Sequence, residues 1–126
     1  MNRFIYIVLL SAIFVIVGCS RADTVEVSGT VRWEGKAIQN GDVIFESTDP
    51  HSPAAAGKIL DGRYAFRCKP GNKRVEIRSY RLTGRKTSQN NPEGAMYIPE
   101  RYNVKSEVTA NVTFDGKNKF DFDLNP

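Results

Sequence analysis

Residues 54–68, AAAGKILDGRYAFRC, decide the fold, because they contain two short strands joined by the turn Asp61-Gly62. Asp-Gly supplies the positive φ angles that a two-residue hairpin turn requires. After the turn, Tyr64, Phe66 and Cys68 recur at every second position, which is the period of a strand with one buried face. The segment therefore predicts a β-hairpin whose second strand directs Cys68 toward the core.

The same alternation continues on both sides of this hairpin. No segment after residue 23 shows the 3.6-residue period of a helix, and turn residues separate the alternating segments. The sequence therefore predicts an all-β domain, an antiparallel β-sandwich of about seven short strands. Besides the hairpin, strands are expected near residues 24–31, 42–46, 73–80, 108–114 and 120–124. The last two, with the turn Asp115-Gly116 between them, are expected to end the chain as an edge or a closing hairpin.

Residues 81–97 (RLTGRKTSQNNPEGAMY) lack apolar periodicity and contain several turn residues, so they predict one long loop. Loops longer than about 12–15 residues tend to be functional or disordered. Positive side chains gather where this loop begins, which suits an acidic glycan, a phosphate-bearing polymer or a protein partner. The alternative is a solvated loop whose charge limits aggregation. The candidate partner-binding residues are Arg78, Arg81, Arg85, Lys86, Asn90, Asn91 and Tyr97. Trp33 beside a turn is a weaker sugar-stacking candidate, and packing in the core or against the turn is its favoured role.

The N-terminus has the composition of a secretory signal. A short basic start precedes 14 uncharged residues at 4–17, fewer than the roughly 20 apolar residues that a membrane-spanning helix needs. The run ends in Ile16-Val17-Gly18-Cys19, which resembles the lipobox of bacterial lipoproteins. That resemblance implies cleavage before Cys19 and lipidation of its sulfur and of the new amino terminus. A retained anchor and a simple secretory signal cut elsewhere are the alternatives.

These patterns divide the chain into three parts. Residues 1–18 are expected to form a helical signal peptide, residues 19–23 the lipidated Cys19 and a short linker, and residues 24–126 one folded domain. The lipid would hold the domain at the cell envelope, on the outer membrane or on the periplasmic face of the inner membrane.

Charge and cysteine content narrow the class of partner. The whole chain has a net charge of +4, and loss of Arg3 with the signal leaves about +3. Because nucleic-acid binding usually requires a clustered basic face, no nucleic-acid partner is expected. With Cys19 committed to lipid, Cys68 has no partner in the same chain, so it is either a buried apolar residue, the favoured interpretation, or a site of intermolecular pairing.

The sequence offers no recognisable catalytic or metal-binding constellation. His51 is the one histidine, it lies between prolines, and no second thiol accompanies it, so neither a metal site nor a cofactor is expected. Asp121 and Asp123 share one face of the last strand, as a pair of glycosidase carboxylates would. Their alternation with apolar residues instead indicates a solvent-facing side. We therefore expect a protein that is not an enzyme.

A family resemblance agrees with this architecture. It rests on the segments Val27-Ser28-Gly29-Thr30-Val31, Trp33-Glu34-Gly35-Lys36-Ala37-Ile38, Gly41-Asp42-Val43-Ile44-Phe45, Asp61-Gly62-Arg63-Tyr64, Lys69-Pro70-Gly71, Val75-Glu76-Ile77 and Ile98-Pro99-Glu100-Arg101-Tyr102-Asn103. With these segments the chain resembles carboxypeptidase regulatory-like domains, and the resemblance extends over residues 25–124. It implies a transthyretin-like β-sandwich and supplies no catalytic residues. One departure is Ala37, where many relatives carry proline.

The sequence thus favours a membrane-tethered envelope lipoprotein with a non-enzymatic binding or assembly module. An envelope hydrolase with an unrecognised active site is the alternative. The expected partners are the membrane, through the lipid on Cys19, and an envelope protein or acidic glycan.

Replacing Cys19 with Ala is expected to abolish incorporation of radiolabelled palmitate, because the sulfur that forms the thioether is removed. Labelling of growing cells measures this, and Cys68→Ala, which keeps Cys19, is the matched control. Palmitate on the Cys19→Ala chain would contradict the lipoprotein interpretation.

Overall fold

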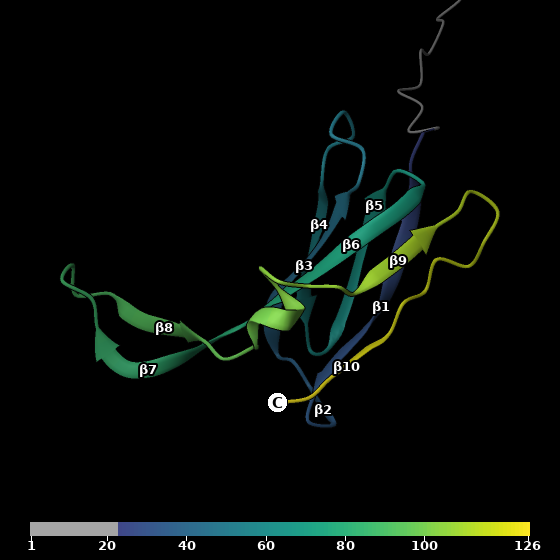
Figure 1. The fold of residues 1–126 in the computed structure, drawn as a ribbon. Helices are drawn as coiled ribbons and strands as arrows, with labels where there is room; N and C mark the ends of the chain where they lie inside the picture. The colour runs from purple at the N-terminus through teal and green to yellow at the C-terminus, as the bar shows by residue number, and fades with distance from the viewer. Residues whose placement is uncertain (1–22) are drawn as a thin grey trace, which may run out of the picture.

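The fold is seen in a computed structural model, which describes residues 23–126 (Figure 1). The expected signal helix at residues 1–18 and the lipidation site Cys19 lie outside the described residues. The described part of the chain holds strands, turns and one short 3-10 helix, so the all-β prediction is confirmed there. No helix in this part is long and apolar enough to cross a membrane.

Residues 23–126 form ten strands, rather than the predicted seven or so. They are β1 (Val25–Trp33), β2 (Lys36–Ala37), β3 (Asn40–Ser47), β4 (Ala55–Leu60), β5 (Arg63–Cys68), β6 (Gly71–Arg78), β7 (Tyr80–Lys86), β8 (Pro92–Met96), β9 (Thr109–Val112) and β10 (Phe122–Leu124), with the 3-10 helix η1 (Glu100–Tyr102) between β8 and β9.

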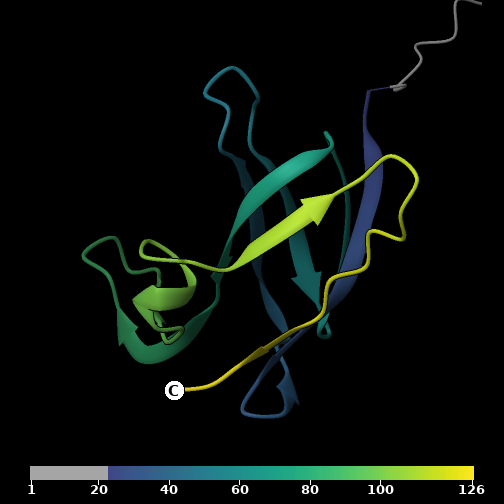
Figure 2. The same cartoon turned by 45° about the vertical axis from the view of Figure 1, so that its right-hand side comes forward.

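Most strands belong to one curled sheet with the order β10-β1-β5-β4-β3-β6-β9, and β2 adds to β1. The Asp61-Gly62 turn forms as predicted, with φ angles of 50° and 78°. Its two strands then diverge: β4 and β5 share one register pair, Leu60 with Arg63, whereas β5 pairs with β1 and β4 pairs with β3 over six positions each. The ring of Phe66 on β5 lies against Gly57 on β4, so close that a Cβ at Gly57 would be only 2.5 Å from it. The turn is therefore a corner at which the sheet folds over on itself (Figures 1 and 2).

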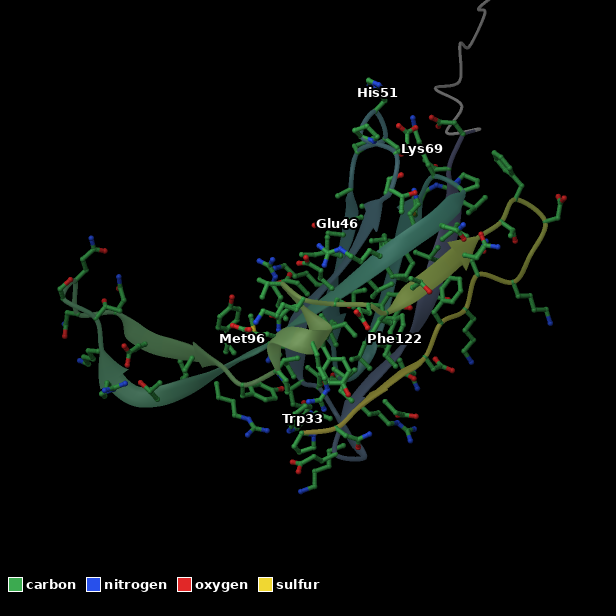
Figure 3. The ribbon with its side chains drawn as sticks, viewed as in Figure 1. Trp33, Glu46, His51, Lys69, Met96 and Phe122 are labelled. Atoms are coloured by element: carbon green, nitrogen blue, oxygen red, sulfur yellow. The ribbon has the colours of Figure 1, made fainter. Side chains whose placement is uncertain are left out.

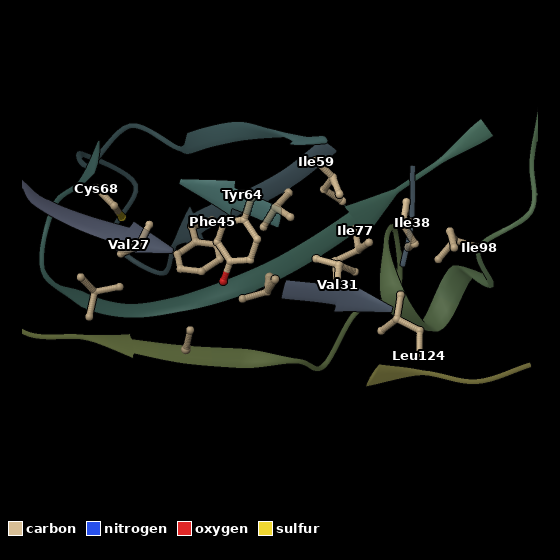
Figure 4. Close-up of a cluster of buried hydrophobic side chains, with 14 residues drawn as sticks. Val27, Val31, Ile38, Phe45, Ile59, Tyr64, Cys68, Ile77, Ile98 and Leu124 are labelled. Carbon is tan, nitrogen blue, oxygen red and sulfur yellow. The ribbon is translucent and has the colours of Figure 1, made fainter. Parts of the chain in front are cut away.

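The core lies inside this curl, on the inward faces that the alternation predicted (Figure 4). The ring of Phe45 makes edge contacts with Tyr64, Phe66 and Phe120, at centroid distances of 6.4, 5.1 and 5.9 Å. Aromatic pairs in such T-shaped arrangements contribute beyond their buried area. Cys68 is buried, which confirms its predicted core position, and burial raises the pKa of its thiol.

The two C-terminal strands lie at the two edges of the sheet, so the edge position is confirmed and the alternative, a closing hairpin, is wrong. β9 pairs antiparallel with β6, whereas β10 pairs parallel with β1 and is the exception in an otherwise antiparallel sheet. Between them, the side chain of Asn118 closes a loop by bonding both the N–H and the carbonyl of Thr113, at 2.9 and 2.8 Å. The chain then crosses to β1, where the N–H of Ser28 donates to the carbonyl of Asn118 (3.0 Å).

Asp121 completes this crossing. Its carboxylate accepts hydrogen bonds from the backbone N–H of Thr30 (2.9 Å) and from the Thr30 hydroxyl (3.0 Å). These two bonds, the backbone one first, hold the pKa of Asp121 below its ordinary value. The carboxylate on the outward face of the last segment therefore has a structural role in joining it to β1.

The predicted loop at 81–97 is also wrong, since most of it forms a separate two-stranded sheet. Tyr80 pairs with Met96, Leu82 with Gly94 and Lys86 with Pro92, and the register shifts between Leu82 and Lys86. Gly84 has a φ of 80° within this irregular stretch. Every residue of β7 is exposed. Apolar and polar residues alternate along a strand when one of its faces is buried. Because β7 buries neither face, its sequence carries no alternation from which the strand could be predicted.

Gly29→Ala is expected to destabilise the protein by about 3 kcal/mol or more, because the new Cβ would lie 1.8 Å from the carbonyl oxygen of Phe120. Thermal unfolding measures this as a loss of more than about 10 °C in Tm. Gly35→Ala is the matched control: its φ is 77° and nothing lies within 4 Å of its new Cβ, so left-handed strain costs only about 1–2 kcal/mol. Equal losses for the two variants would contradict the close approach at Gly29.

Candidate functional site

The two-stranded sheet projects sideways from the domain body (Figures 1 and 2). We call residues 80–96 the arm. It carries Arg81, Arg85 and Lys86 against the single acid Glu93, whereas the rest of residues 23–126 balances 13 Lys and Arg with 13 Asp and Glu. The net positive charge of the described domain is thus concentrated on the arm, where it raises the local concentration of anions.

A groove opens where the arm joins the body. It has a volume of about 690 Å³, within the range typical of ligand sites. Three stretches that are distant in sequence meet around it: the β1–β2 turn, the β2–β3 connection, and the base of the arm. The groove is lined by Trp33, Glu34, Lys36, Ala37, Ile38, Gln39, Asn40, Ser79, Tyr80, Arg81 and Tyr97.

Buried hydrogen bonds hold these stretches together. The hydroxyl of Ser79 donates to the carbonyl of Asn40 (2.6 Å), and Ser79 is itself buried. Next to it, the antiparallel register of β3 and β6 places Asp42 opposite Arg78. The two strands of the sheet body therefore fix the β2–β3 connection against the base of the arm.

An aromatic and cationic cluster lines the groove. The guanidinium of Arg81 lies over the ring of Tyr97, 3.9 Å from its centroid. The other neighbour of Tyr97 is Trp33, at a centroid distance of 5.9 Å and an interplanar angle of 76°. No ion pair forms with Arg81 among the described residues, so its charge is compensated only by the face of the Tyr97 ring.

The structure thus brings three of the predicted residues together, Arg81 and Tyr97 with Trp33, and separates the others. Arg78 points to the body, where its guanidinium pairs with Glu76 at 2.7 Å. Arg85 pairs with Glu93 across the arm at 3.0 Å. The remaining candidates lie at the end of β7 or in the turn beyond it: Lys86, Asn90 and Asn91.

Sequence reasoning missed part of the groove. Tyr80, which is 56% exposed at the base of the arm, lines the groove together with Gln39 and Asn40, and none of the three was among the predicted binding residues. The sequence shows these residues only as polar or aromatic side chains beside turns, a pattern that is common in surface loops and does not indicate a binding site. Only the contact between residues 33–40 and 79–97 gives them a shared role.

The groove lies at the far end of the domain from the start of the described chain. β1 begins at Val25, which pairs with Cys68, and ends at Trp33 beside the groove. Near the start of β1, Lys69 forms an ion pair with Asp23 at 3.5 Å. Figure 3 shows Lys69 and His51 near that start and Trp33 at the opposite end.

The other sequence candidates do not assemble a reactive site. His51 is exposed in the β3–β4 connection, and the thiol of Cys68 donates to the carbonyl of Lys69 (3.2 Å). Burial raises the pKa of that thiol, which disfavours the thiolate needed for nucleophilic attack. Within residues 23–126, no group of three His, Cys, Asp or Glu side chains is placed to hold a metal ion.

No protein-family model and no curated protein matches the chain. Among solved structures, it is similar to a DUF3823 family protein from Parabacteroides merdae ATCC 43184, with 14% identity and a TM-score of 0.41, over 81% of this chain and 44% of that one. It is also similar to a 9R-lipoxygenase from Cyanothece PCC8801, with 15% identity and a TM-score of 0.38, over 83% of this chain and 17% of that one. The chain spans less than half the length of either protein.

Proposed function

We propose that this chain is a lipid-anchored protein of the cell envelope whose domain is a non-enzymatic binding module. The observation that carries the proposal is the position of the groove and the charged arm. Both features lie at the end of β1 that is farther from Asp23, the first described residue, where a partner would have access without displacing an anchor at Cys19. The lipobox-like Gly18-Cys19 motif supports the anchor itself.

The dimensions suit this arrangement. A nine-residue strand such as β1 spans about 30 Å, and a flexible linker of four residues adds only about 10–12 Å. A tether at Cys19 would therefore keep the domain close to the bilayer with the groove directed away from it.

The finer fold assignment is part of the proposal. We infer that the curled sheet is a transthyretin-like β-sandwich of the carboxypeptidase regulatory-like kind. The corner at Asp61-Gly62 supports this, because it divides the sheet into a β10-β1-β5 layer and a β4-β3-β6-β9 layer around one core. Hydrolysis is the alternative function. It would be favoured by a nucleophile beside a base, and we find no such pair in residues 23–126.

Reversing the charge of the arm is expected to remove its partner. In envelope pulldowns with the full-length lipoprotein, the triple variant Arg81→Glu, Arg85→Glu and Lys86→Glu should recover at least about tenfold less partner than the wild type, because attraction becomes repulsion. The matched control carries the same change in net charge at exposed positions outside the arm and the groove: Arg32→Glu, Arg63→Glu and Lys117→Glu.

The control should recover the partner at the wild-type level. Equal recovery with the two triple variants, whether retained or lost in both, would contradict recognition through the arm.

A further inference from the structure

We propose that the groove at the base of the arm binds an anionic sugar unit of an envelope polysaccharide. This inference rests on the proposed binding function and assigns its ligand class. It follows from three properties of the groove that occur together: exposed aromatic surface, an unpaired cation and side-chain amides.

The aromatic surface is split between two roles. Tyr97 has Arg81 over its ring and Trp33 at an edge-on angle, so it positions both neighbours. Trp33 and Tyr80 also line the groove, and Tyr80 is 56% exposed. The apolar C–H face of a pyranose ring packs against such aromatic faces, where each ring supplies a large rigid contact area at little entropic cost.

The cation selects the charge of the sugar. Arg81 is held over Tyr97 with no acidic partner among residues 23–126, and a guanidinium pairs with a carboxylate or a phosphate through two parallel hydrogen bonds. Lys36, on the β1–β2 side of the groove, is a second cation without an ion-pair partner in the described part of the chain. Glu34 on the same rim carries a negative charge, which weakens the attraction of the groove for any anion, so the aromatic surface must contribute to binding.

Side-chain amides complete the site. Gln39 and Asn40 line the groove, and each amide offers both donors and an acceptor, as the hydroxyls of a sugar require. The body supports these groups, because the Asn40 carbonyl is bonded to the buried Ser79 hydroxyl. The arm continues from the groove with Arg85 and Lys86, which allows further anionic units of a polymer to follow.

The test uses the full-length lipoprotein in detergent and four fluorescent probes of matched length. Oligogalacturonate has both ring and charge, its methyl-esterified form has the ring without the charge, and polyglutamate has the charge without the ring. An oligosaccharide phosphate separates phosphate from carboxylate as the source of the anion. Fluorescence anisotropy at a fixed salt concentration gives each Kd.

We expect the charged oligosaccharides to bind at least tenfold more tightly than the ester or polyglutamate. Trp33→Ala and Arg81→Gln should each weaken that binding about tenfold, whereas Trp33→Phe should restore most of it. The control Arg63→Gln should keep binding within about twofold, because Arg63 lines a separate hollow on the sheet body.

Binding that depends on charge alone, or that is unchanged in Trp33→Ala, overturns the proposal. If no saccharide binds but the envelope pulldown still depends on the arm, the ligand is a protein: the sugar assignment falls and the binding function stands. If neither assay detects a partner, both fall.

Discussion

The separation of β4 from β5 immediately after their shared turn is the constraint on which the rest of the structure depends. Beyond the Leu60–Arg63 pair each strand takes a different partner, and the ring of Phe66 lies over Gly57 between them. The sheet must then fold over at Asp61-Gly62, and the faces that come to oppose each other bury Phe45 and its aromatic neighbours. A flat sheet with the same strands would leave those faces in water at a cost of roughly 1.5–3 kcal/mol per large side chain.

The curl also sets the two ends of the domain. β1 runs from one end to the other, and both the C-terminal crossing and β5 are registered against it. The connections near Val25 belong to the end where the N-terminal segment leaves the domain, and the connections near Trp33 belong to the groove. If the proposed lipid anchor is present, membrane attachment and partner recognition would therefore lie at opposite ends of β1.

Sequence patterns predicted the parts of this architecture that depend on local chemistry. The Asp-Gly turn requires positive φ angles, and strands with one buried face must alternate, so the hairpin turn, the core position of Cys68 and the all-β class followed directly. The arm did not follow, because a strand such as β7 that buries neither face carries no alternation. The parallel pairing of β10 with β1 rests on three residues brought from the far end of the chain, and the groove depends on a hydrogen bond between Ser79 and Asn40. Neither contact can be predicted from the residues that neighbour it in the sequence.

Membrane distances test the central claim, that the groove faces away from the anchored end, most directly. Spin labels are attached to Lys36→Cys at the groove and to His51→Cys at the opposite end of the full-length protein, in vesicles that carry a paramagnetic relaxant at the bilayer surface; Cys68 is buried and does not compete for the label. The account predicts that the relaxant enhances the relaxation of the label at residue 51, and that residue 36 lies about 30 Å farther from the bilayer, the length of β1. Equal depths at the two positions, or residue 36 closer to the bilayer, would contradict it.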